Sequence, residues 1–399
     1  MIVDRLTLGE TAAGVERAAR VRWRDGEFRV TVTVPAEFAH DDVDGSPFLC
    51  ATLLPAMRAG EHLEVDGPVS RRLLAGAAVA RDTYLDWCPD LYPSRLSVAG
   101  ELELPPRADG VGCFFSRGVD STFSIAQSRP GADLTRLLYV DRLEPRHDQG
   151  VRAEEIRRAH LVAERAGLPL TVIDTNLREF TDGFVRNWED MAGAGLAFVA
   201  NALAAGIRRV VIPSTDGPLV GPCGTSPLLD PLFSTELVDV VHDSVSKSRV
   251  EKVFWLARER HELVSSLKVC FEQNVPGNCG RCSKCLVTMV SLEAAGVLHL
   301  AEEFPPLDLD TLDAIEKPFR TWTWFAEAAE ALDPVRQSRL RELVLEGARP
   351  PTGPPRAIPE DSPNFRSRGN AKLGRLAALG DDATGVEEGR PRRFSLRRR

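Results

Sequence analysis

The sequence contains no apolar run approaching the roughly 18 residues that a membrane-spanning helix needs. Its first ten residues carry charges where a signal peptide would place an apolar segment. We therefore expect a cytoplasmic protein with no membrane partner. The 399 residues suggest two or three domains, and a hydrophobic content of 43% is enough for a buried core without disulfide bonds.

The sequence also does not fit a secreted protein held together by disulfide bonds, because such proteins are shorter and richer in cysteine. Four of the eight cysteines are isolated in the sequence: Cys50, Cys88, Cys113 and Cys223. The other four are clustered: Cys270, Cys279, Cys282 and Cys285. This clustering favours a metal site in an intracellular protein.

Charge is distributed unevenly along the chain. The net charge is -8, yet residues 350–399 are net basic and rich in proline, glycine and arginine. We expect residues 350–399 to form a disordered basic tail. Because the remainder is acidic, a nucleic-acid partner is not favoured, and a small-molecule substrate is expected. The sequence leaves the oligomeric state open, and an oligomer is possible.

Residues 1–107 are expected to form a small N-terminal α+β domain. Apolar residues alternate with polar ones over 21–34 around the turn Asp25-Gly26, which predicts a β-hairpin. The other expected elements are helices at Pro47–Met57 and Val69–Trp87 and a strand at Leu96–Leu104.

Residues 108–300 alternate apolar strand-like segments with helical patterns. The expected strands are Val111–Phe115, Leu137–Val140, Leu170–Ile173 and Arg209–Ile212. This alternation predicts βαβ units and a Rossmann-like α/β core with a parallel sheet. Right-handed crossovers then gather the loops that follow the strands at one edge, where ligands bind. Further helical patterns predict a helical extension over 301–349.

The strand-to-helix turn at residues 116–122 concentrates polar donors. Such a turn aims several backbone N–H groups at one point, and the helix dipole favours an anion there. The hydroxyls of Ser116, Ser121 and Thr122 add donors for phosphate oxygens, and Asp120 could hold Mg²⁺. The common P-loop pattern G-x-x-x-x-G-K-S/T occurs nowhere. Simple N-capping is the alternative interpretation of the serines.

This turn resembles the S-G-G-x-D-S signature of the PP-loop ATP pyrophosphatases, the adenine nucleotide alpha hydrolase-like superfamily. The resemblance implies a HUP-like nucleotide-binding core that uses ATP and Mg²⁺. It implies that the nucleotide contacts Ser116, Gly118, Val119, Asp120, Ser121, Thr122, Tyr139 and Asp141, the last two near adenine and ribose.

The sequence departs from the signature at Arg117, which stands where the family has glycine. If that glycine has positive φ, a side chain there costs about 1–2 kcal/mol. Arg117 could offset this cost by contacting a phosphate or a substrate carboxylate. It could equally mark a loop that no longer supports turnover.

The spacing C-x8-C-x2-C-x2-C over residues 270–285 predicts a four-cysteine zinc knuckle. Close C-x-x-C pairs let four thiolates converge on one ion in the closed tetrahedral arrangement of structural zinc. Gly277 and Gly280 supply the backbone freedom that such a knuckle needs. An iron–sulfur cluster and four buried free thiols are the alternatives.

The order of the two motifs is similar to that of the 7-cyano-7-deazaguanine synthase family. That family carries a PP-loop near its start and a four-cysteine zinc site near its end, and the resemblance spans about Gly110–Leu298. The family's nucleobase pocket has no recognisable counterpart between residues 212 and 235. We therefore expect a different natural substrate.

The segment before the cysteines supplies further candidates for contacts with Mg²⁺ or substrate: Asp216, Asp230, Ser234 and Thr235. Of these, Asp230 is expected to be catalytic together with Asp120 and Arg117. Turn and N-cap chemistry is the alternative, since Asp-Gly and Asp-Pro are turn signals.

Basic and imidazole side chains complete the candidates. Lys247, Arg249 and Lys252 could meet a leaving pyrophosphate or form a solvated helix face. His147 and His242 each have the chemistry of a general base, but the sequence assigns neither a role.

The leading functional hypothesis is an ATP-dependent ligase that forms AMP and pyrophosphate. It would adenylate a small-molecule carboxylate or amide for attack by ammonia or another nucleophile. One alternative is an RNA-modifying PP-loop enzyme that uses the basic tail to contact phosphates. The other is a nucleotide-binding scaffold in which Arg117 blocks turnover.

Overall fold

The computed structural model describes residues 1–38, 43–88, 90–103, 108–127, 134–143, 148–185, 188–215, 223–272, 275–315 and 319–347. The expected disordered tail at 350–399 lies outside the described residues. The candidates His147 and Asp216 also lie outside them.

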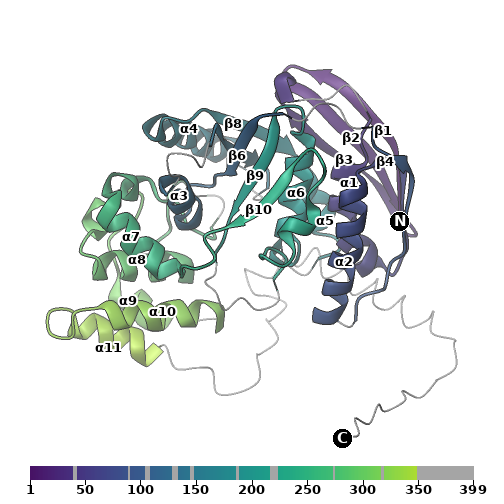
Figure 1. Ribbon diagram of the computed structural model, residues 1–399. Helices are drawn as coiled ribbons and strands as arrows, with labels where there is room; N and C mark the ends of the chain where they lie inside the picture. Colours follow the sequence, from purple (N-terminus) through teal and green to yellow (C-terminus); the bar gives the residue numbers. More distant parts are fainter. Residues whose placement is uncertain are drawn as a thin grey trace, which may run out of the picture.

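The described strands form one ten-stranded sheet in the order β10-β9-β6-β7-β8-β3-β2-β1-β4-β5 (Figure 1). Their bounds are β1 Ile2–Thr11, β2 Gly14–Trp23, β3 Gly26–Val34, β4 Leu63–Val69, β5 Leu96–Glu101, β6 Gly110–Phe114, β7 Arg136–Asp141, β8 Leu170–Thr175, β9 Ile207–Pro213 and β10 Asp239–Asp243. Strands β6 to β10 are parallel, β8, β3, β2 and β1 pair antiparallel, and β4 and β5 continue parallel to β1. The expected α/β class with a mostly parallel sheet is confirmed.

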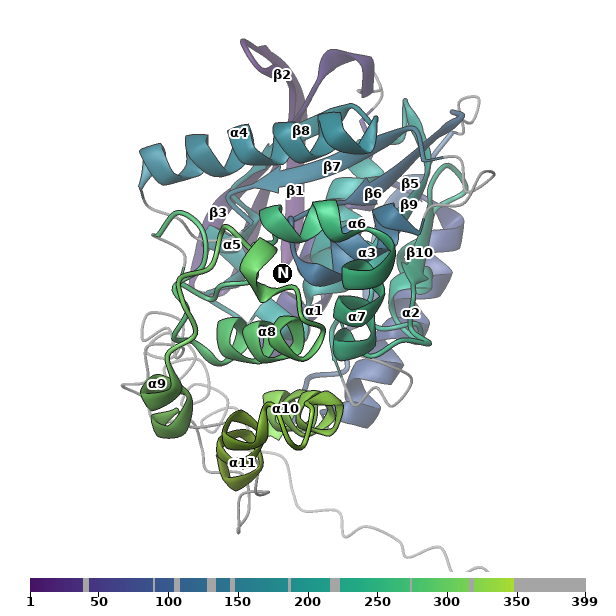
Figure 2. The same ribbon diagram turned by 90° about the vertical axis from the view of Figure 1, so that its left-hand side faces the viewer.

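Helices cover both faces of the parallel strands. Their bounds are α1 Ser46–Ala59, α2 Arg71–Trp87, α3 Val119–Ala126, α4 Gln149–Ala166, α5 Leu177–Thr181, α6 Ala192–Ala202, α7 Arg249–Glu259, α8 Ser283–Ala294, α9 Leu309–Ala314, α10 Phe319–Ala331 and α11 Ser338–Gly347. Helices α3 and α4 pack on one face, whereas α6 and α1 pack on the other (Figure 1). Helices α9 to α11 lie beyond α7 and α8, far from β2 (Figure 2). Within the described part of the chain, no helix has the length and apolar character to cross a membrane.

The parallel strands are doubly wound. The chain passes from β6 through α3 to β7 and through α4 to β8, and then returns across the other face to β9, beside β6. The direction of winding therefore reverses between β6 and β9. In open parallel sheets, ligands bind at such a switch point, outside the carboxyl ends of the strands. The loop that follows β6 lies at this position.

The N-terminal strands extend this same sheet. Strand β3 pairs with β8 through Val32 opposite Thr175 and Thr33 opposite Asp174. Buried residues of β3 and α1 share one apolar cluster with residues of β6 and α6. The strands that precede the expected boundary at 107 and those that follow it thus belong to one sheet.

Strands β1, β4 and β10 have no counterpart among the expected elements. Strand β4 contains Asp66-Gly67-Pro68, a group of residues that ordinarily signals a turn. Strand β10 is five residues long, and three of the five are polar. Strands β4 and β10 gain their hydrogen bonds from neighbours that are remote in sequence, and local patterns do not report such pairing. Strand β1 pairs with the adjacent β2 as a hairpin.

Candidate functional site

The loop after β6 places its polar groups at the N-terminus of α3. The Ser116 N–H lies 3.3 Å from the Ser121 hydroxyl, and the two serine hydroxyls are 3.4 Å apart. Gly118 is the extended N-cap residue of α3, and its carbonyl accepts from the Thr122 N–H at 2.9 Å. Val119 is fully buried and presents no exposed surface to a ligand. The loop thus offers serine hydroxyls and a helix N-terminus, both of which suit an anion.

Arg117 has φ of +63°, so this position does adopt the left-handed conformation that favours glycine. Its guanidinium does not lie over the loop but is buried between Glu155 of α4 and Glu303, at 3.8 and 3.6 Å. None of its nitrogens has a hydrogen-bond partner among the described residues, and burial lowers its pKa. The Arg117 carbonyl accepts from the Lys268 N–H at 3.0 Å. Arg117 therefore joins the loop to α4 and to the segment that carries the cysteines.

Asp120, in the first turn of α3, is flanked by two cations from α7. Arg249 Nη1 donates to Asp120 Oδ2 at 2.6 Å, and Lys252 Nζ lies 3.5 Å from Oδ1. Both cations are buried, and Lys252 also donates to the Ser214 carbonyl at 2.5 Å. Burial lowers the pKa of Lys252, and the Asp120 carboxylate opposes that shift. The structure thus brings Arg249 and Lys252 to the loop, whereas Lys247 lies 3.9 Å from Glu251 on the exposed side.

Strands β9 and β10 complete this edge of the sheet. Asp243, the last residue of β10, accepts from the hydroxyls of Ser124 on α3 and of Ser244, at 2.7 and 2.6 Å. Its carbonyl accepts from the Ser214 N–H at 3.0 Å. The segments after β6, β9 and β10 therefore meet at one place, although the sequence analysis did not identify Asp243.

Tyr139 and Asp141 end the neighbouring strand β7. Tyr139 is buried, and the Asp141 carboxylate already accepts from Arg152 and from the Arg142 N–H. The hydrogen bond to Asp141 raises the pKa of Arg152. A nucleotide that contacts Asp141 would share it with these two donors.

Asp230 lies on the opposite face of the sheet from α3, where it meets His242 of β10. Asp230 is completely buried in the 3-10 helix η3 (Asp230–Phe233), and its Oδ2 lies 2.8 Å from His242 Nδ1. The carboxylate also accepts from the Thr225 hydroxyl at 2.9 Å and from the Ser226 N–H at 3.2 Å. Gly193 permits this approach, because a Cβ there would lie 2.0 Å from Asp230 Oδ1. Eleven residues separate Asp230 from His242 in the sequence, and no local motif links the two.

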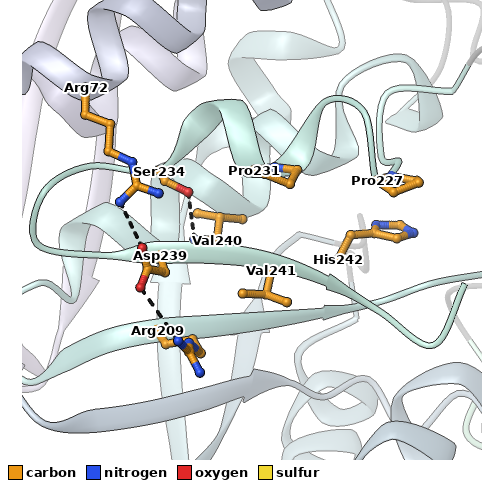
Figure 3. A pocket seen from close by; sticks show the side chains of 9 residues that line it. All are labelled: Arg72, Arg209, Pro227, Pro231, Ser234, Asp239, Val240, Val241 and His242. Atoms are coloured by element: carbon orange, nitrogen blue, oxygen red, sulfur yellow. Dashed lines mark hydrogen bonds and ion pairs between the residues drawn. The ribbon is translucent and has the colours of Figure 1, made fainter.

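An open depression of about 450 Å³ runs along the exposed edge of β10 (Figure 3). Its lining residues are Arg72, Arg209, Pro227, Pro231, Ser234, Asp239, Val240, Val241 and His242. Figure 3 shows Arg72 and Arg209 at Asp239, near the start of β10, and His242 below Pro227 near its other end. Ser234 accepts from the Val240 N–H, and Thr235 accepts from the Val238 N–H, so both hydroxyls serve the backbone of this turn.

The clustered cysteines Cys270, Cys279, Cys282 and Cys285 come together in space. Their sulfur atoms all lie within 4.8 Å of one another, which could hold a metal ion such as zinc. The backbone N–H groups of Cys279, Cys282 and Cys285 each point at the sulfur of an earlier cysteine, at 3.3 to 3.5 Å. Gly277 and Gly280 have φ of +71° and +69°, as the knuckle requires. The donor set of four thiols with N–H···S bonds fits a closed structural site.

The cysteine cluster is tied directly to the loop after β6. The Gly277 N–H approaches Glu155 Oε1 at 3.4 Å, and the Asn278 N–H donates to the Glu303 carbonyl at 2.9 Å. Glu155 and Glu303 are the two carboxylates that face Arg117. Lys268 adds a further link, because its ammonium donates to the carbonyls of Val275 and Gly277.

No protein-family model matches this chain, and no curated protein is significantly similar to it in sequence.

Proposed function

We propose that this protein is an ATP-dependent ligase that forms AMP and pyrophosphate, with a small-molecule carboxylate or amide as the group that is adenylated. The observation that supports this best is the convergence at the switch point of the sheet. Ser116, Ser121 and the N-terminus of α3 meet Arg249 and Lys252 there. Phosphate oxygens are suited to this combination of hydroxyls, backbone N–H groups and buried cations.

In this proposal the residues have distinct tasks. The loop hydroxyls and backbone N–H groups hold the ATP phosphates, and Asp120 orients Mg²⁺. A substrate oxygen attacks the α-phosphorus in line, the bond to the β-phosphate oxygen breaks, and pyrophosphate leaves. Arg249 and Lys252 balance the charge that develops on this leaving group. A nucleophile then displaces AMP from the adenylate.

The cysteine cluster has a structural task in the same proposal. We assign it zinc, held by Cys270, Cys279, Cys282 and Cys285, with no open position for a substrate. The metal would fix Gly277 and Asn278, whose N–H groups contact Glu155 and the Glu303 carbonyl. The side-chain carboxylates of Glu155 and Glu303 in turn lie on either side of the Arg117 guanidinium. The strained Arg117 would then keep the loop in one conformation without touching the substrate.

Phosphorus NMR of MgATP with the metal-loaded protein, ammonia and a pool of small carboxylic acids tests the proposal. We expect AMP and pyrophosphate to appear with one acid fraction. Ser121→Ala should slow this reaction, whereas Ser265→Ala, on an exposed 3-10 turn, should not. Release of ADP and phosphate would contradict the proposal. Tight ATP binding without products in every fraction would favour the scaffold alternative.

A further inference from the structure

Asp230 fixes the hydrogen position on His242. Its carboxyl group accepts from the Thr225 hydroxyl and the Ser226 N–H, and its Oδ2 lies 2.8 Å from His242 Nδ1. Because a carboxylate only accepts hydrogen bonds, we place the hydrogen of the imidazole on Nδ1. In the neutral ring, the second nitrogen, Nε2, then presents a lone pair.

His242 Nε2 has no hydrogen-bond partner among the described residues, although it is buried. The side chain of His242 is only 3% exposed, and it borders the open depression along β10. Buried polar atoms are rarely left in this state, and those that are tend to serve a ligand or a reaction. The unpartnered atom is an acceptor, which calls for a ligand that brings an N–H or O–H group.

His242 lies near the carboxyl end of β10, at the edge of the sheet that also carries the loop after β6. His242 pairs with Ile212 of β9, and β9 lies between β10 and β6. Consecutive residues of a strand face opposite sides of a sheet. Asp243 accordingly reaches Ser124 on α3, whereas His242 reaches Asp230 on the other face. The end of β10 therefore contributes Asp243 to the polar side chains at α3 and His242 to those around Asp230. The open depression along β10 is lined in part by His242.

We propose that His242, oriented by Asp230, accepts the proton from an amine nucleophile, either ammonia or a primary amine; this inference rests on the proposed ligase function. The amine nitrogen forms a bond to the carbonyl carbon of the adenylate, and the bond from that carbon to the phosphate oxygen breaks. AMP leaves with the electron pair of that bond. The nitrogen becomes acidic only as it forms its new bond, so a base as weak as imidazole is sufficient. The proton goes to Nε2, and Asp230 stabilises the resulting imidazolium.

NMR of the full chain labelled with ¹⁵N in histidine tests the assignment without ATP. His242→Gln identifies the His242 ring signals, and His62, which accepts a hydrogen bond from the Arg95 N–H, serves as the control ring. Near pH 8 we expect hydrogen on Nδ1 alone. Methylamine should shift the Nε2 signal, whereas tetramethylammonium, which has no N–H group, should not. Hydrogen on Nε2, or an Nε2 signal that ignores methylamine, would overturn the assignment.

A kinetic comparison separates this inference from the proposed function. His242→Gln should lower amine-dependent release of AMP by about 10²- to 10⁴-fold, the usual contribution of a general base. Exchange of labelled pyrophosphate into ATP should stay near the wild-type rate, because it reports only adenylation. Unchanged amine-dependent release in the variant would overturn the role of His242 and leave the ligase intact. Absence of adenylation in the wild type would instead overturn the ligase, whatever the NMR result.

Discussion

Replacement of Lys252 by methionine offers the most direct test of the loop as a phosphate site. Lys252 has no exposed surface, and its Nζ lies 3.5 Å from Oδ1 of Asp120, the residue before Ser121. A hydrogen bond to a charged group contributes about 1.5–3 kcal/mol. Its loss should therefore weaken ATP binding by about 10- to 150-fold. Isothermal titration calorimetry with MgATP measures this change directly.

The fold should tolerate this substitution. Methionine fills most of the space of the lysine stem, and Arg249 still donates to Asp120. The Ser214 carbonyl loses a donor, but the cost of burying the ammonium disappears with it. We expect the free energy of unfolding to change by no more than about 2 kcal/mol. Lys247→Met, on the exposed side next to Glu251, is the matched control. Equal ATP affinities for the two variants would refute the reasoning.

Three further predictions concern the metal site and the N-terminal strands. Gly280→Ala should weaken metal retention, because φ is +69° and a Cβ would meet Pro305 at 2.3 Å; an unchanged metal content after dialysis would contradict this. Removal of the metal with a chelator should free four thiols for a thiol reagent and lower the thermal midpoint, since structural zinc contributes directly to folding. Asp4→Asn should destabilise the protein by about 1–2 kcal/mol at neutral pH. Hydrogen bonds from Arg20 and Arg22 lower the pKa of Asp4 to about 2 from 3.8, so this contribution exists above pH 3.8 and disappears as the pH falls to about 2. Urea titrations across this range should show the difference between wild type and variant closing at low pH.

Local patterns in the sequence predicted four of the five parallel strands β6 to β10. The expected segments Val111–Phe115, Leu137–Val140, Leu170–Ile173 and Arg209–Ile212 correspond to β6, β7, β8 and β9. Each is a short apolar run bounded by polar residues, as is typical of a strand buried on both faces. The cysteine spacing likewise predicted a cluster that the structure confirms, because residues so close in sequence have little freedom to separate.

Contacts between distant segments could not be predicted in the same way. The pairing of β3 with β8 joins residues about 140 positions apart, and nothing in either strand specifies its partner. Arg117 stood out as a departure from a signature, but its burial between Glu155 and Glu303 depends on how α4 and the cysteine segment pack. Asp230 and His242 each appeared as an isolated candidate, because their contact requires η3 to lie across β10.

The link from the cysteine cluster through Glu303 and Arg117 to the loop after β6 has a thermodynamic consequence. If the loop binds a nucleotide and the cysteines bind a metal, as proposed, any coupling between the two sites is reciprocal. Any factor by which the metal strengthens nucleotide binding must also be the factor by which nucleotide strengthens metal binding. A cell that fills the loop with nucleotide would then also protect the metal from competing chelators. The supply of either ligand would then affect how fully the other site is occupied.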